Sequence, residues 1–301
     1  MSLSLSKLEP GQGHIALRNH GSGNVFTHLS ATYPLKLLSP NLHSPNVSVV
    51  YVLSYGGGLV GGDHVQLDIE VHDGAQLVIL SQGSTKVFKA RHGQRLSSRA
   101  NISPVTVQRL DFQVAPRSAL FLLPDPVTCF RSAKYHQLQT FHLATDSSAV
   151  LLDWITSGRK SLGEDWAFAK YYSLNEVWVD GKRIAKDALL LEDRDSTHKP
   201  FALRSLAESL APYSCYATII IYGALVEDTI AHLTAAYEVI TVFKQASPSS
   251  LLWSLSPICE GKGCVVRVAA TETEDVKNWL KAALRDLERV LGVDVYRRIF
   301  A

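Results

Sequence analysis

The chain has 301 residues, 46% of them hydrophobic, which is the composition of a globular protein with a large core. Its net charge of +2 is too small to attract nucleic acid or an anionic membrane surface, so neither partner is expected. Four cysteines are too few for a disulfide framework, and no apolar run reaches the roughly 18 residues of a membrane span. The N-terminal residues 1–7 also lack the blocks of a signal peptide, so a cytoplasmic location is expected.

The first two thirds of the chain alternate apolar and polar residues with a period of two, which is typical of β-strands. In 65–71, every second residue is apolar, so one face of this strand is predicted to be buried. Asp180-Gly181 marks a tight hairpin turn between two more strands. Strand follows strand with no helical stretch between them, so this part is predicted to be mainly antiparallel. Similar strand patterns occur at 47–55, 105–114 and 135–143.

The last third of the chain has a different pattern. Residues 214–226 indicate a buried strand, and 227–243 have the spacing of a helix. We therefore expect one unit, 1–301, with a β body at about 1–195 and a smaller α/β end at about 200–301. The polar loop at 191–200 is the expected boundary between them.

The C-terminal region predicts an amphipathic helix. Thr271 and Glu274 have the spacing of a capping box. Gly292 is the expected end of the helix. The apolar stripe between them consists of Val276, Trp279, Leu280, Ala283, Leu284, Leu287, Val290 and Leu291.

A glycine-rich stretch, GGGLVGGD, occupies residues 56–63, and its first six residues fit G-x-G-x-x-G. A dinucleotide site needs a helix to begin at the third glycine, but Gly61 is followed by a strand pattern. The chain also has no G-x-x-x-x-G-K-[ST] sequence, which excludes nucleotide hydrolysis at a P-loop. The favoured interpretation is a glycine bend that lets another backbone approach closely, with Asp63 and His64 at its exit.

Several motifs resemble the UreD (also called UreH) family of urease accessory proteins. The glycine stretch, followed by SQGSTKVFKA at 81–90, is similar to two specific segments of that family. The similarity continues in order along almost the whole chain. The further matching segments are YPLKLLSP (33–40), LLPDP (122–126), SGRKSLGEDWAF (157–168), VVRVAA (265–270) and VYRRIF (295–300).

The resemblance implies a protein that is not an enzyme. The expected fold is a large body of stacked antiparallel or mixed β-sheets with a few helices. Proteins of this family bind apo-urease and a UreF-like protein, which recruits a UreG-like GTPase, and a homodimer within the complex is possible. No permanently bound cofactor is expected, because nickel passes through the protein on its way to urease.

A passage must bind ions weakly enough to release them, which favours scattered carboxylates and imidazoles over a closed cage. Asp153 is unusual because it is a charge within an apolar strand, and Arg159 is its expected partner. Asp63 and Asp125 also have a structural interpretation, as a capping and a turn-forming residue, and Glu164 could likewise form a structural pair with Arg159. The candidate nickel-passage residues are Asp63, His64, Asp125, Asp153 and Glu164. Those expected to line the passage or support it are Gly58, Gly61, Gly62, Ser84, Thr85, Lys86 and Arg159.

Two other classes of function remain open at this point. A hydrolase could use Asp63 and Glu164 as acid and base, provided that both lie in one cleft with different pKa values. A nickel storage or sensor protein would need a dense histidine or cysteine cluster. The eleven histidines are instead dispersed from His14 to His232.

Overall fold

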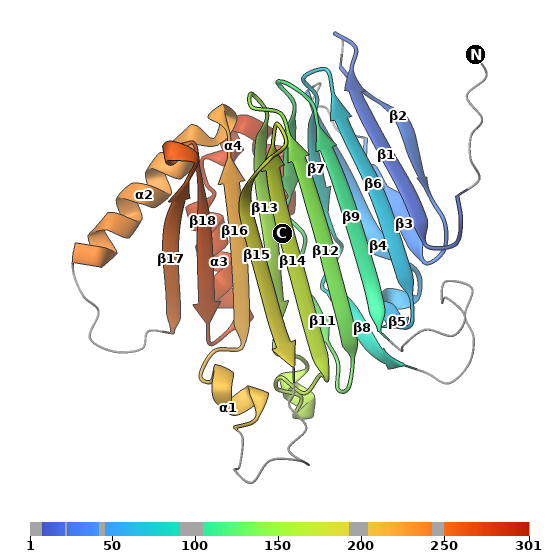
Figure 1. Ribbon diagram of the computed structural model, residues 1–301, viewed down its shortest axis with the longest axis vertical. Coiled ribbons are helices and arrows are strands. Elements are labelled where there is room, and N and C mark those ends of the chain that lie inside the picture. The colour runs from blue at the N-terminus through green and yellow to red at the C-terminus, as the bar shows by residue number, and fades with distance from the viewer. Residues whose placement is uncertain are drawn as a thin grey trace.

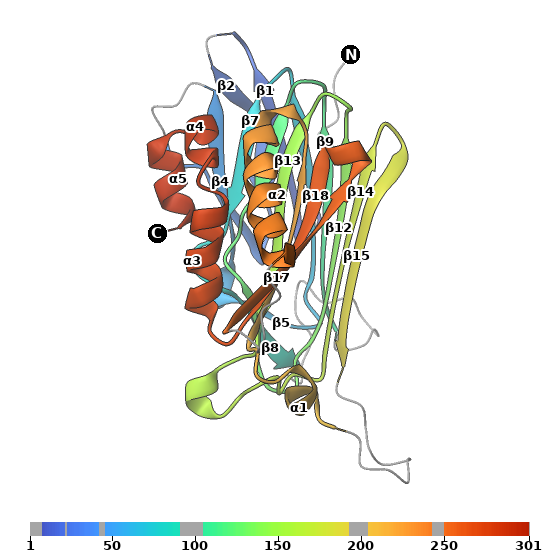
Figure 2. The same cartoon turned by 90° about the vertical axis from the view of Figure 1, so that its left-hand side faces the viewer.

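The computed structural model describes residues 8–21, 23–41, 46–90, 105–192, 204–242 and 250–300. The N-terminal segment 1–7 and the part of the expected boundary loop after residue 192 lie outside these ranges. Within them, the strands form two large sheets that stack face to face, and helices cover the outer face of one sheet (Figures 1 and 2). The prediction of a mainly β fold with few helices is confirmed.

Of the described strands, seven form the first sheet. Its outer face carries no helix in the part of the chain that the structure describes (Figure 2). The spatial order is β15 (Lys182–Glu192), β14 (Lys170–Val179), β12 (Lys134–Leu143), β9 (Thr106–Val114), β6 (His64–His72), β1 (Gln12–Asn19) and β2 (Asn24–Ala31).

The second sheet contains eleven described strands. Three short strands, β11 (Val127–Cys129), β8 (Thr85–Ala90) and β5 (Leu59–Gly61), extend it beside β13. Its main order is β17 (Leu251–Ile258), β18 (Gly263–Ala270), β16 (Cys215–Tyr222), β13 (Ser148–Thr156), β10 (Ala119–Leu122), β7 (Gln76–Leu80), β4 (Val47–Ser54) and β3 (Leu35–Leu38).

Most neighbouring strands in the first two thirds of the chain are parallel, so the prediction of a mainly antiparallel arrangement is wrong. The cause is that, apart from the short strands β8 and β11, which stay in the second sheet, the strands β6, β7, β9, β10, β12, β13 and β14 alternate between the two sheets. Each step in this series crosses to the other sheet, so a sheet receives successive strands that run the same way. The turn at Asp73 and Gly74, both with positive φ, makes one such crossing. A period-two pattern does not show to which sheet a strand belongs.

The hairpin predicted at Asp180-Gly181 is confirmed. It joins β14 and β15, which pair antiparallel within one sheet. Asp180 has φ 45° and Gly181 φ 79°, as a two-residue turn with two left-handed positions requires.

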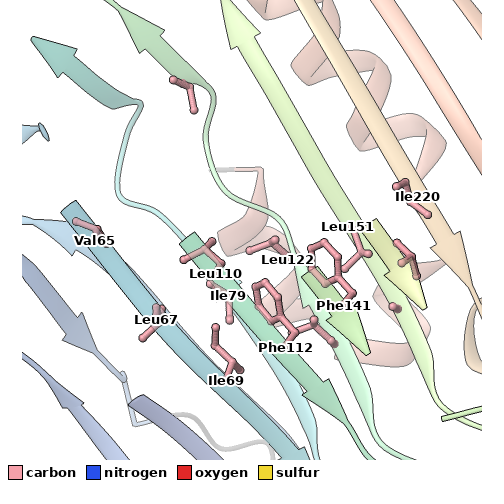
Figure 3. Close-up of a cluster of buried hydrophobic side chains, with 14 of the residues drawn as sticks. Val65, Leu67, Ile69, Ile79, Leu110, Phe112, Leu122, Phe141, Leu151 and Ile220 are labelled. Atoms are coloured by element: carbon pink, nitrogen blue, oxygen red, sulfur yellow. The ribbon is translucent and has the colours of Figure 1, made fainter. Parts of the chain in front are cut away.

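Two apolar cores hold three layers together. The core between the sheets includes the stacked rings of Phe112 and Phe141, whose centroids lie 4.5 Å apart (Figure 3). The second core lies between the eleven-stranded sheet and the helices. Because that sheet is covered on both faces, its central strand β13 is an almost continuous apolar run.

The helices pack against the second sheet. A helix was predicted at 227–243, and α2 (Glu227–Val242) confirms it. The C-terminal stripe is divided between α3 (Thr273–Ala283) and α4 (Leu287–Leu291), followed by α5 (Val293–Ile299). A short α1 (Leu206–Leu210) precedes β16. None of the described helices is both long enough and apolar enough to cross a membrane.

The two ends predicted for the C-terminal helix have different outcomes. Gly292, with φ 84°, ends α4 as expected. The capping box at Thr271 is wrong, because α3 begins two residues later without a side-chain cap. The Thr271 N–H instead donates to the Ser250 carbonyl at 2.9 Å, so Thr271 continues the contacts of the sheet.

Candidate functional site

The glycine bend is closed by Asp63. The Asp63 carboxylate accepts a hydrogen bond from the Val60 N–H at 2.8 Å, and the Asp63 N–H donates to the Val60 carbonyl at 2.8 Å. Asp63 is only 2% exposed, and it follows Gly62, which has φ 90°. His64, half-buried, begins β6. Asp63 therefore stabilises the tight connection from β5 to β6.

Gly58 shows why the bend needs glycine. A Cβ atom at this position would lie 2.5 Å from the Lys86 carbonyl oxygen, so a side chain would push β8 away. Gly61 lies on β5, which pairs with β8. The stretch thus brings two backbones together, and a strand follows it instead of a helix. The surface beside it is a pocket of about 560 Å³, whose lining includes Gly56, Gly57, Ser84, Thr85 and Lys86.

Asp125 ties two loops together at the surface. Its carboxylate accepts a hydrogen bond from the Gly83 N–H at 2.9 Å, and its own N–H donates to the Ser81 hydroxyl oxygen at 2.8 Å. Asp125 and Ser81 line a surface pocket of about 520 Å³. Both also line a cavity of about 50 Å³ between the sheets, which is enough for a few water molecules. This pair of residues therefore joins the surface to the interior.

Asp153 lies on β13 and faces this interior cavity. The Asp153 carboxylate is surrounded by protein. The residue is still partly accessible to water, because it lines the cavity. Four neutral groups donate hydrogen bonds to it: Gln137 Nε2 at 2.9 Å, Ser173 Oγ at 2.5 Å, Asn175 Nδ2 at 2.8 Å and, more weakly, the Tyr171 hydroxyl at 3.4 Å. Burial raises the pKa of Asp153, and the hydrogen bonds from Ser173, Asn175 and Gln137 oppose that shift. Asp153 is therefore a buried acid held by neutral donors.

None of these donors is among the site residues predicted from the sequence. The signal that could have found them is the phase of the strands. In β12, Tyr135 and Phe141 are buried, so the alternate residues between them also face inward. A glutamine at such a position is a buried polar group that needs partners. The polar residues on this inward face, all buried, are Gln137, Gln139, Ser173 and Asn175.

Arg159 pairs with Glu164 and not, as expected, with Asp153. Its Nε and Nη2 atoms donate to the two carboxylate oxygens of Glu164 at 2.9 and 2.6 Å, and its guanidinium lies 4.0 Å from the centre of the Phe130 ring. The hydrogen bond from Arg159 is the main cause that lowers the pKa of Glu164. Arg159 is about equally close in sequence to Glu164 and to Asp153, but the Asp153 side chain points into the cavity between the sheets.

The hydrolase hypothesis required Asp63 and Glu164 in one cleft. Neither residue is among those that line the interior cavity. Each has structural partners, and Glu164, with its lowered pKa, is ionised when a general acid would have to carry a proton. The geometry therefore does not support Asp63 and Glu164 as an acid–base pair.

Glu164 predicts a pH dependence of stability. Its folded pKa is lowered, so its contribution to stability is fully present above its ordinary pKa of 4.5 and is lost as the pH falls through the folded value. We expect Glu164→Gln to lower the urea midpoint at pH ~7, and we expect the difference from the wild type to shrink as the pH falls below the ordinary pKa of 4.5. Urea unfolding at several pH values measures this. A difference that is constant with pH would contradict the assignment.

Among the residues that the structure describes, no group of three or more His, Cys, Asp or Glu side chains is arranged to hold a metal ion. The described residues therefore give no support to the hypothesis of a dense storage site. The carboxylates that line the interior cavity are Asp153 and, where the cavity meets the surface, Asp125.

Comparison with known proteins agrees with the motifs. The family model described as UreD urease accessory protein matches residues 9–299. Urease accessory protein 4 of Cryptococcus neoformans is 36% identical over 296 residues, covering 92% of this chain and 90% of that protein. Urease accessory protein D of Arabidopsis thaliana is 34% identical over 307 residues, covering 94% and 99%. Urease accessory protein UreD of Sorangium cellulosum is 35% identical over 289 residues, covering 96% and 84%. The chain therefore belongs to the UreD urease accessory protein family, and it is an accessory protein and not an enzyme.

Proposed function

We propose that this chain is a cytoplasmic scaffold that delivers nickel to apo-urease through its own interior. The observation that carries the proposal is Asp153, a buried carboxylate held by neutral donors, which faces a cavity that Asp125 and Ser81 join to the surface. The chain acts as one unit, 1–301. It binds apo-urease and a UreF-like protein, through which a UreG-like GTPase brings nickel, and a homodimer forms within this complex.

The electrostatics of the cavity suit a transient cation. Among the described residues, Asp153 forms no ion pair, so its negative charge is available to a passing cation. Its donors are neutral and orient the carboxylate without repelling the metal. One carboxylate and a few amide oxygens bind nickel more weakly than a complete ligand set would. Such weak binding lets an ion leave as well as enter.

In this proposal the other candidate residues have supporting roles. Asp63, Gly58, Gly61 and Gly62 shape the connection beside the surface pocket. Glu164 and Arg159 hold the loop after β13 as an ion pair. Ser84, Thr85 and Lys86 line the pocket beside the glycine bend, and His64 begins β6 next to it.

The experiment is a comparison of cells with and without this gene. Without it, we expect urease protein at normal abundance but with little nickel and little activity, and the wild-type gene should restore both. Urease activity, urease abundance and nickel content of the purified urease are measured together. Full activity and full nickel content in cells without the gene would overturn the proposal.

A further inference from the structure

A row of polar residues crosses the apolar interior between the sheets. In the first sheet, Gln139, Asn175 and Asp187 are direct partners on β12, β14 and β15. Directly opposite residues on neighbouring strands point to the same face, so the three share one side of the sheet. Gln139 and Asn175 are buried there. The row thus runs from the middle of the sheet to its edge strand β15.

The second sheet carries a matching row. Asp153, Thr218 and Arg267 are direct partners on β13, β16 and β18. Since Asp153 bonds to Gln137, Ser173 and Asn175 of the first sheet, this row also faces inward. We call the two rows together the polar seam: Gln139, Asn175 and Asp187 with Asp153, Thr218 and Arg267. It extends from Asp153, which lines the cavity, to β15 and β18. β15 is the edge strand of the first sheet, and β18 lies next to the edge strand β17 of the second sheet (Figure 1).

An ion pair closes the seam at that edge. Arg267 Nη2 donates to Asp187 Oδ1 at 2.6 Å, and this contact links β18 of one sheet to β15 of the other. The Asp187 side chain is 14% exposed, whereas that of Arg267 is 51% exposed. Asp187 also lies near enough to Asp153 that its charge contributes to raising the pKa of Asp153. The charge of Asp187 at the edge therefore acts on the interior carboxylate of Asp153.

We propose that Arg267 and Asp187 form a charge gate for divalent cations at the β15–β18 edge of the polar seam. With the pair formed, the Arg267 guanidinium repels a cation, as an arginine does in pores that exclude cations. When Arg267 turns outward, the Asp187 carboxylate can bind a cation, and it is the next negative group along the polar seam after Asp153. Because Arg267 is half-exposed, water can replace its contact with Asp187 at low cost, so the gate opens without unfolding.

This inference rests on the proposed nickel passage and adds a second opening with its control. The net charge of the edge pair decides the direction of each effect. It is zero in the wild type, −1 in Arg267→Gln and +1 in Asp187→Asn. A cation should therefore pass faster in the first variant and more slowly in the second. A purely structural ion pair predicts the same direction for both, because each variant loses the same contact.

The test is the rate of nickel transfer into apo-urease by purified complexes that contain the full chain and its partners, with Ni²⁺ supplied as the probe. We expect Arg267→Gln to raise this rate and Asp187→Asn to lower it, each on the order of tenfold at low salt, and both effects to shrink at high salt. Arg183→Gln is the matched control, because Arg183 pairs with Glu176 at 3.0 Å elsewhere on β15 and β14, outside the seam.

The outcomes separate the two proposals. Equal rates for Arg267→Gln, Asp187→Asn and wild type, or a change in the same direction for both variants, would overturn the gate. If Asp153→Asn in the same assay still abolishes transfer, the passage stands without the gate. If Asp153→Asn transfers nickel at the wild-type rate, the passage itself fails, whatever the edge variants do.

Discussion

Asp153→Asn is expected to fold normally and to reduce nickel delivery at least tenfold. The substitution keeps the size of the side chain but removes the charge that a divalent cation would meet in the cavity. Burying this charge costs stability, so its removal offsets the less favourable hydrogen bonds to Gln137, Ser173 and Asn175. We expect a thermal midpoint within a few degrees of the wild type. The measurements are nickel content of urease and thermal unfolding of the variant complex.

The control for this prediction is Asp68→Asn, which removes an exposed carboxylate from β6. It should leave nickel content unchanged. A pH series adds an independent check. Because the folded pKa of Asp153 is raised, its stability contribution runs opposite to that of Glu164: wild-type stability relative to Asp153→Asn is greatest at low pH and falls as the pH rises through the folded pKa. Urease with full nickel content from cells that carry Asp153→Asn would contradict the assignment.

Phe112→Ala is expected to cause the largest loss of stability. Phe112 is fully buried, stacks on Phe141 with an angle of 13° between the rings, and borders the cavity (Figure 3). Its removal enlarges an existing void, so the free energy of unfolding should fall by about 3–5 kcal/mol. Urea unfolding measures the loss. Phe26→Ala, a half-buried ring on the edge strand β2, is the control and should cost clearly less. Equal losses for the two variants would contradict the prediction, because they would mean that the core closes into the space left by the Phe112 ring.

Local signals in the sequence predicted local structure well. The hairpin at Asp180-Gly181 needs only two left-handed positions, and the end of a helix at Gly292 needs one, so a few residues contain the information. The capping box at Thr271 failed because a distant strand end, at Ser250, competes for the backbone of Thr271. Its short-range pattern was present, but a tertiary contact outweighed it.

The candidate site shows the same difference between local signals, which the sequence reveals, and long-range contacts, which it does not. Asp153 could be singled out because a charge within an apolar strand is unusual. Its partners could not be identified, because they come from the opposite sheet, and the alternation of the chain between sheets is not visible in a period-two pattern. Arg159, the nearest cation in sequence, was the wrong partner for this reason.

The alternation of strands between sheets also has a consequence for synthesis on the ribosome. The three successive strands β12, β13 and β14 carry Asp153, its donors Gln137, Ser173 and Asn175, and the neighbouring Gln139. One continuous piece of nascent chain therefore contains the interior carboxylate together with its donors. Arg267 follows only later in the chain, on β18. A chain released before β18 would therefore contain the acidic interior without the arginine at its edge.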